Sequence, residues 1–101
     1  MKIKTEKMSQ AADGAVGLLQ SLGNKSRLMI MCQLIDGEKS VGELAELLQA
    51  RESTVSQHLA LLRKDRLVTT RRQGQTIFYT IASEPARQVL ETLYAIYCPQ
   101  D

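Results

Sequence analysis

The sequence predicts a mainly helical domain with a small β-hairpin, in the order α-α-α-α-β-β-α. Apolar residues recur at helical spacing through most of the chain, and capping signals divide them into separate helices. One stretch, about residues 67–81, changes to alternating β-rich composition around a central glycine, which is typical of a hairpin. With 101 residues and ordinary hydrophobic content, the chain has room for one core. We therefore expect a single domain over residues 1–101.

The first two helices are expected at about residues 8–22 and 25–36. Glycines within the first helix weaken it in isolation, so it needs another surface to pack against. The second helix carries Cys32 on its apolar stripe, and Gly37 is placed to end it as a C-cap glycine. We therefore expect Cys32 to point into or along the core.

Residues 41–65 contain two further helices separated by a short break. Ser40 and Glu43 form the pattern of a capping box, which predicts a third helix over about 41–49. A fourth helix is expected over about 52–65, with an apolar edge on one side and a polar surface on the other. A capped short helix, a turn and a polar-faced helix form a helix-turn-helix. The apolar edge of the fourth helix consists of Val55, Leu59 and Leu62.

A β-hairpin over about residues 67–81 follows, which makes the predicted helix-turn-helix a winged one. Its strands are expected at 67–72 and 76–81, with Ile77, Tyr79 and Ile81 facing the core. A last helix is expected over about 83–98, and it ends at Cys98. Its predicted inward stripe consists of Ala86, Val89, Leu90, Leu93 and Tyr97.

Positive charge gathers on the helix-turn-helix and hairpin. Residues 51–75 hold six basic and two acidic side chains, a local balance of +4 in a chain of net charge +2. Such a patch attracts phosphate, and the fourth helix would enter the major groove of double-stranded DNA. A solvated surface is the alternative for single residues, and Ser53 could simply cap its helix. The candidate DNA contacts are Ser53, Thr54, Ser56, Gln57, His58, Arg63 and Lys64 on the helix, and Arg71, Arg72, Gln73 and Gln75 on the hairpin.

The chain has two cysteines, Cys32 and Cys98, each at the end of an apolar run. Two thiols and one histidine are a poor tetrahedral metal site, but two thiols suffice for one bridge. The alternative is that each is a small buried apolar side chain. We expect no metal, no cofactor and no enzyme activity, because the sequence has no carboxylate pair, phosphate loop or histidine base for Cys98. The absence of a signal peptide or apolar span predicts a cytoplasmic protein without membrane association.

Several segments resemble the ArsR/SmtB family of winged-helix repressors over nearly the whole chain. They are LLQSLGNKSRLMIMCQL, SVGELAELL, TVSQHLALLRKDRLVTTRRQGQTIFYTI and ETLYAIYC. The pattern S-x-H-L-x-x-L-R, found here from Ser56 to Arg63, is highly specific to that family's recognition helix. The chain departs from the family at Arg51, where many members carry a serine or similar cap. This change either frays the helix start or adds a phosphate contact.

The positions of Cys32 and Cys98 resemble one branch of that family, the regulators BigR, SqrR and HlyU. The resemblance implies that both cysteines are redox-active and sense persulfide or sulfane sulfur, which would join them through a disulfide or a longer sulfur bridge. Metal sensing, common in other members, is the first alternative. It is disfavoured because the third helix, VGELAELL, lacks the C-x-C ligands and the last helix contains no histidine. A regulator without a thiol switch, constitutive or acting by displacing another repressor, is the second.

The apolar helices at about 8–22 and 83–98 are expected to form a two-fold dimer interface. A homodimer would hold its recognition helices about 34 Å apart, which matches successive major grooves of an inverted-repeat operator. We expect the reduced homodimer to bind this DNA and repress transcription. Reactive sulfur species, or another thiol oxidant, would act as the inducer that releases it.

Overall fold

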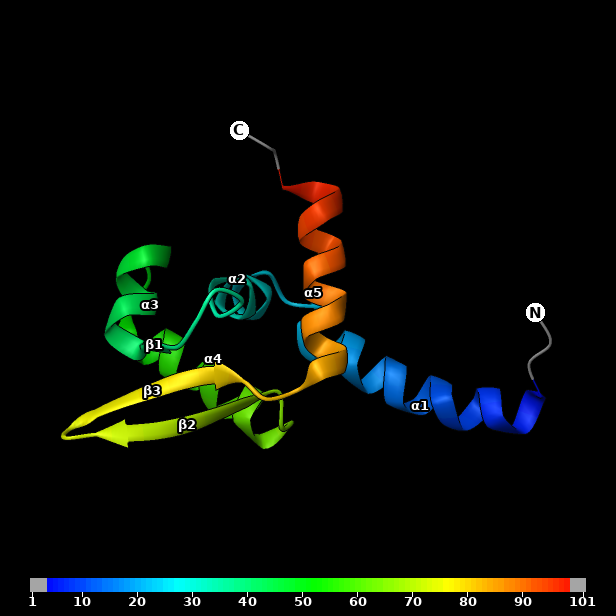
Figure 1. Cartoon of the computed structure of the whole chain (residues 1–101). Helices are drawn as coiled ribbons and strands as arrows, with labels where there is room; N and C mark the ends of the chain where they lie inside the picture. Colours follow the sequence, from blue (N-terminus) through cyan, green and yellow to red (C-terminus); the bar gives the residue numbers. More distant parts are fainter. Residues whose placement is uncertain (1–3, 99–101) are drawn as a thin grey trace.

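The computed structural model describes residues 4–98 and confirms a mainly helical winged fold. Residues 1–3 and 99–101 of the predicted domain lie outside the described part of the chain. The body is built around the second, third and fourth helices, with the hairpin extending from one side (Figure 1). The elements are α1 (Thr5–Leu22), α2 (Lys25–Gln33), β1 (Lys39–Ser40), α3 (Val41–Leu48), α4 (Glu52–Lys64), β2 (Val68–Gln73), β3 (Thr76–Ile81) and α5 (Glu84–Tyr97).

The short strand β1 is an element that the sequence analysis did not predict. Its two residues, Lys39 and Ser40, pair antiparallel with Tyr79 and Phe78 of β3, so the sheet has the order β1-β3-β2. Two residues are too few to show alternation, and Ser40 also caps α3. The strand is therefore defined by its tertiary pairing rather than by a local pattern.

Helix α2 ends at Gln33, and the prediction that it continues to residue 36 and is capped by Gly37 is wrong. Side chains from other parts of the chain donate hydrogen bonds to backbone carbonyl groups at and just beyond this end of the helix. Lys39 Nζ donates to the Gln33 carbonyl oxygen at 2.8 Å, and Arg87 Nη1 donates to the carbonyl of Ile35 at 3.1 Å. Gly37 lies in the following loop at φ 146°, a conformation that favours glycine.

The core lies between α2, α3, α4, the base of the hairpin and the first half of α5. The predicted apolar edge of α4 is fully buried, which confirms its orientation. Ile77 is 41% exposed and Tyr97 is 77% exposed, so the expectation that they face the core is wrong. Ile77 is the second residue of β3, next to the hairpin turn, and Tyr97 is the last residue of α5. The tip of the hairpin and the end of α5 both extend beyond the packed body (Figure 1). The buried residues are Leu22, Ile30, Met31, Leu34, Leu44, Ala45, Val55, Leu59, Leu62, Leu67, Val68, Ala86 and Leu90.

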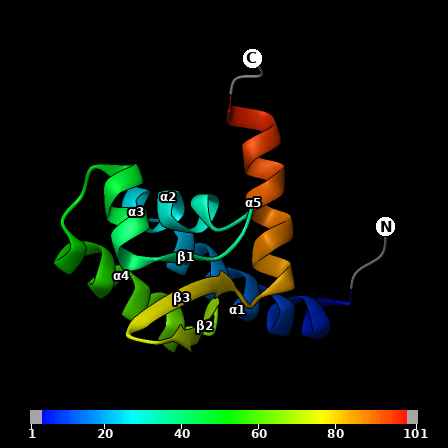
Figure 2. The same ribbon diagram turned by 60° about the vertical axis from the view of Figure 1, so that its left-hand side comes forward.

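Helices α1 and α5 project from this body in different directions (Figure 2). Leu22 is the buried residue of α1, and Leu18 packs partly against the core. Within residues 4–98, no helix is both long and apolar enough to cross a membrane. Both projecting helices carry large apolar side chains that remain exposed. These are Met8, Val16 and Leu19 on α1 and Tyr94, Ile96 and Tyr97 on α5.

Candidate functional site

The capping box predicted for the third helix is present and fixes the start of the helix-turn-helix. Ser40 Oγ accepts from the Glu43 backbone N–H at 3.2 Å, and Glu43 Oε1 accepts from the Ser40 N–H at 3.0 Å. Gln49 ends α3 at φ 52°, in the left-handed region, and the chain turns there into α4. Helices α3 and α4 pack together and against α2. The buried edge of α4 is held inward, and its polar surface faces solvent.

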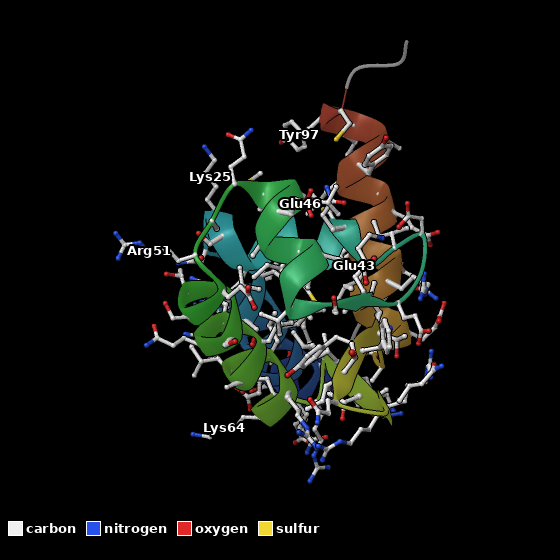
Figure 3. All side chains as sticks on the ribbon, turned by 90° about the vertical axis from the view of Figure 1, so that its left-hand side faces the viewer. Lys25, Glu43, Glu46, Arg51, Lys64 and Tyr97 are labelled. Carbon is white, nitrogen blue, oxygen red and sulfur yellow. The ribbon has the colours of Figure 1, made fainter. Side chains whose placement is uncertain are left out.

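The polar surface of α4 presents most of the predicted helical DNA contacts to solvent. Arg51 is the N-cap residue but makes no side-chain cap, and α4 still begins at Glu52. Figure 3 shows Arg51 and Lys64 near opposite ends of α4, with their side chains directed away from the body. Positive charge therefore stands at both ends of the helix. The exposed predicted contacts are Ser53, Thr54, Ser56, Gln57, Arg63 and Lys64.

His58 differs from the other predicted contacts because it turns toward α2. It is half-buried, and its Nδ1 atom is enclosed with no hydrogen-bond partner among the described residues. A cavity of about 70 Å³ beside it is lined by Ser26 and Met29 of α2 and by Leu48 at the end of α3. The structure therefore does not offer His58 Nδ1 to a base or a phosphate. The position follows from α4 geometry, because His58 lies three residues after buried Val55 and four residues before buried Leu62, on the same side of the helix.

A groove of about 390 Å³ separates α4 from the hairpin, and it brings together two predicted contacts that lie far apart in the sequence. Ser56 of α4 and Gln75 of the hairpin turn both line it. Gly42 and Thr76 also line it, and the sequence analysis did not propose them. No local motif singles these two out, because the groove exists only when the hairpin folds beside the helices.

Arg71 and Arg72 of the hairpin have different surroundings. Their partners in the register are Phe78 and Ile77, so their side chains lie on opposite faces of the sheet. Ile77 lines the groove, which places Arg72 on the groove side, where its Nε donates to the Gly74 carbonyl oxygen at 3.0 Å. Arg71 is instead paired with Glu38, which raises its pKa and lowers the pKa of the Glu38 carboxyl. Gln73 bonds Arg71 Nη1 through its side-chain oxygen at 3.0 Å.

The two cysteines are free thiols, and both are half-buried. Cys32 lies near the end of α2 and packs against the core, as expected, beside a cavity of about 340 Å³ lined by Ile35, Asp36, Glu91 and Tyr94. Cys98 ends α5, where its backbone N–H donates to the Tyr94 carbonyl oxygen at 3.0 Å. Burial raises the pKa of the Cys32 thiol, and the neighbouring Cys98 thiol raises it further. Cys32 on α2 and Cys98 at the end of α5 therefore lie on two helices that contact each other.

Acidic side chains border the thiol cavity, but they do not form a metal site with the cysteines. Lys39 Nζ donates to Asp36 Oδ1 at 2.6 Å, and this hydrogen bond and charge lower the pKa of the Asp36 carboxyl. Over residues 4–98, no three His, Cys, Asp or Glu side chains are grouped so that they could hold a metal ion.

Comparison with known proteins finds close similarity along nearly the whole chain. A family described as "Bacterial regulatory protein, arsR family" matches residues 24–70. The transcriptional activator HlyU of Vibrio cholerae serotype O1 is 45% identical over 92% of this chain and 86% of its own length. The biofilm growth-associated repressor of Agrobacterium fabrum is 44% identical over 90% of this chain and 78% of its own length.

Solved structures agree with these sequence matches. Reduced HlyU from Vibrio cholerae superposes with a TM-score of 0.90 at 45% identity, covering 93% of this chain and 99% of that one. The repressor BigR from Xylella fastidiosa gives a TM-score of 0.87 at 39% identity, covering 97% and 100%. A winged helix-turn-helix domain from Mycobacterium bovis, described as homodimeric, gives a TM-score of 0.76 at 26% identity. The match covers 95% of this chain and 89% of that one.

The capped helix-turn-helix, the exposed polar surface of α4 and the basic hairpin define a winged-helix DNA-binding transcriptional regulator. The similarity to known proteins also identifies the family within this class. The chain belongs to the ArsR family of bacterial regulators, and its close relatives include HlyU and BigR.

Proposed function

We propose that this protein is a homodimeric repressor that releases operator DNA when a sulfur bridge joins Cys32 to Cys98. The placement of the two cysteines carries the proposal, because both are half-buried and Cys32 lines a cavity between α2 and α5, the helix that Cys98 ends. The cavity beside Cys32 supports it, since α5 supplies two of its lining residues, Glu91 and Tyr94. A small sulfur compound could thus approach the thiols between α2 and α5. In this proposal the protein works in the cytoplasm, where thiols stay reduced until an oxidant arrives.

DNA binding in this proposal uses the exposed surface of α4 in the major groove and the hairpin at its side. Gln57 is suited to pair with adenine, and the basic side chains at the ends of α4 are suited to bind phosphates. Arg72 and Gln75 on the hairpin would contact the flanking backbone. His58 is left out of this set, because its Nδ1 is enclosed against α2.

The dimer in this proposal forms through the uncovered faces of α1 and α5. Leu19 is 59% exposed and Ile96 is 65% exposed, and large apolar side chains at this exposure favour a partner surface. The similar domain from Mycobacterium bovis is described as homodimeric. A two-fold dimer would place two α4 helices about 34 Å apart, as an inverted repeat requires.

The proposed oxidant is a hydropersulfide, RSSH. A first cysteine thiolate attacks its outer sulfur, which forms a protein persulfide and releases the thiol RSH. The second thiolate attacks the inner sulfur of that persulfide, so the protein disulfide forms and hydrosulfide leaves. Two protein thiols lose two electrons, and the sulfane sulfur is reduced to hydrosulfide. If both cysteines are first persulfidated, attack of one on the inner sulfur of the other gives a trisulfide and one hydrosulfide.

The bridge would change DNA affinity because it connects two elements with different tasks. Helix α2 packs against α3 and α4, and α5 belongs to the proposed dimer interface. Joining them fixes the position of the DNA-binding unit relative to the dimer axis. A 100-fold weaker affinity corresponds to about 2.7 kcal/mol of coupling, which is within the range of known allosteric effects.

The test measures DNA affinity at fixed salt before and after treatment with glutathione persulfide, for the wild type, Cys32→Ser and Cys98→Ser. The wild type should lose affinity, and each single variant should keep it. Release of either variant to the same extent as the wild type would show that the bridge is not the switch. Intact mass spectrometry identifies the product: a disulfide lowers the mass by about 2 Da, whereas a trisulfide raises it by about 30 Da.

A second candidate is a regulator without a thiol switch that acts by displacing another DNA-binding protein. A relative described as a transcriptional activator favours this candidate. Footprinting combined with transcription in vitro separates the two functions. The protein alone represses its own promoter under the main proposal. Under the second, it raises transcription only when the competing protein is present.

A further inference from the structure

The loop that follows α2 is connected to the hairpin by one ion pair, between Glu38 and Arg71. Arg71 Nε donates to Glu38 Oε2 at 2.7 Å, and Nη2 donates to Glu38 Oε1 in a second contact. Glu38 immediately precedes β1, Arg71 lies in β2, and β3 lies between these two strands. The pair therefore crosses the central strand and joins both edges of the sheet. Paired contacts of this kind fix orientation as well as distance.

Each nitrogen of the Arg71 guanidinium donates a hydrogen bond within the protein, while half of the side chain stays exposed. In addition to Glu38, it donates to the side chain of Gln73, and its Cζ atom lies 4.7 Å from the centroid of the Phe78 ring. This geometry removes Arg71 from the set of free phosphate contacts, whereas Arg72 on the groove side keeps an uncompensated charge in the described structure. Arg71 is thus placed to position the hairpin.

Glu38 is also tied to the thiol cavity through a short segment of chain. Cys32 precedes it by six residues, and Ile35 and Asp36 in between both line the cavity. Arg87 of α5 donates to the Ile35 carbonyl oxygen, and Lys39 bonds both Asp36 and the end of α2. A displacement of α2 relative to α5 would therefore move this segment and Glu38 with it.

We propose that the Glu38–Arg71 pair is the link through which the segment following Cys32 sets the position of the hairpin on DNA. The inference rests on the thiol switch proposed above. In the reduced protein the pair connects this segment to the hairpin without displacing the hairpin from the DNA backbone. When the bridge joins α2 to α5, the segment shifts and the pair draws the hairpin out of register with the phosphates.

The test compares the ratio of DNA dissociation constants for the bridged and reduced protein. The DNA is a duplex selected from a random library by the reduced full-length chain, and the bridging reagent is glutathione persulfide. The variants are Glu38→Gln, Arg71→Gln and the double variant. Glu46→Gln, an exposed acid on α3, and Arg72→Gln, the neighbouring arginine, are the matched controls. Thermal unfolding and mass spectrometry of each variant verify that it folds and forms the bridge.

In the variants that break the pair, the ratio should fall about threefold or more below the wild-type ratio, and the double variant should fall no further than either single one. Arg72→Gln should weaken both states equally, and Glu46→Gln should leave the ratio unchanged. If the wild type responds but variants lacking the pair keep its ratio within about twofold, the link is refuted and the thiol switch stands. If the bridged wild type binds DNA as tightly as the reduced form, both are refuted.

Discussion

The two adjacent arginines of the hairpin provide a sharp test of the proposed DNA interface. They are chemically identical, but the sheet places them on opposite faces, with Arg72 beside the groove and Arg71 paired with Glu38. We compare Arg72→Gln with the double variant Glu38→Gln/Arg71→Gln. The double variant removes an arginine while leaving the net charge unchanged. We expect Arg72→Gln to reduce the salt dependence of DNA binding and the double variant to leave it nearly unchanged.

The magnitude follows from the release of counterions by each phosphate contact. One contact contributes about 0.9 to the steepness of the slope of log affinity against log salt. The loss of affinity caused by removing that contact is therefore about 3.5 times larger at 50 mM salt than at 200 mM salt. A dimer with both hairpins on DNA doubles the change in slope, to about 1.8, and the corresponding factor is about 12. For the double variant, we expect the slope to stay within about 0.3 of the wild-type slope.

The assay is fluorescence anisotropy of a labelled duplex over a series of salt concentrations. Phosphate contacts do not depend on sequence, so a duplex of arbitrary sequence is sufficient. Lys7→Gln, on α1 and outside the helix-turn-helix and hairpin, serves as a control for an exposed charge that is not a proposed DNA contact, and it should leave the slope unchanged. Equal changes in slope for Arg72→Gln and the double variant would refute the assignment of different roles to the two arginines.

Three further predictions concern the dimer, the thiols and the ion pair. Leu19→Glu should give a monomer by analytical ultracentrifugation and lower operator affinity by about 100-fold or more, because the second half-site is no longer held nearby; an unchanged mass would contradict the interface. Since burial raises the pKa of the Cys32 thiol, Cys32 in Cys98→Ser should be persulfidated more slowly by glutathione persulfide in the folded protein than in the urea-unfolded chain, and rapid-quench mass spectrometry measures both rates. Arg71 lowers the pKa of the Glu38 carboxyl, so the pair stabilises the fold above the ordinary carboxyl pKa, and this contribution is lost as the pH falls through the lowered value. Urea unfolding should therefore show Glu38→Gln less stable than wild type at neutral pH, with the difference shrinking as the pH falls below the ordinary carboxyl pKa, and a difference that does not change with pH would contradict the pair.

Elements whose signal is local could be predicted from the sequence. The capping box at Ser40 depends on two residues three positions apart, and the buried edge of α4 depends on helical spacing, so both agree with the structure. The end of α2 could not be predicted. It is set by Lys39 and Arg87, whose side chains take the free carbonyl groups from outside the helix. A glycine at residue 37 was a weaker signal than these tertiary contacts.

In the candidate site, too, the features with a local sequence signal could be predicted and those set by tertiary contacts could not. The polar residues of α4 follow from one helical pattern, and most of them are exposed as predicted. His58 carries the family motif, but the motif alone does not state which way the ring turns. Its spacing of three residues from buried Val55 and four from buried Leu62 places it on the side that faces α2. Helical phase therefore identified the surface as a whole but not the residue at its margin.

The different roles of Arg71 and Arg72 depend on the strand that the sequence did not reveal. Successive residues of a strand face opposite sides, so a shift of one residue in the hairpin register would exchange the two arginines. The turn at Gly74, with φ 62°, and the pairing of Gln73 with Thr76 fix that register. Pairing of β1 with β3 then brings Glu38 to the face where Arg71 lies, and not to the face of Arg72. The two-residue strand thus determines which arginine is neutralised and which is left for DNA.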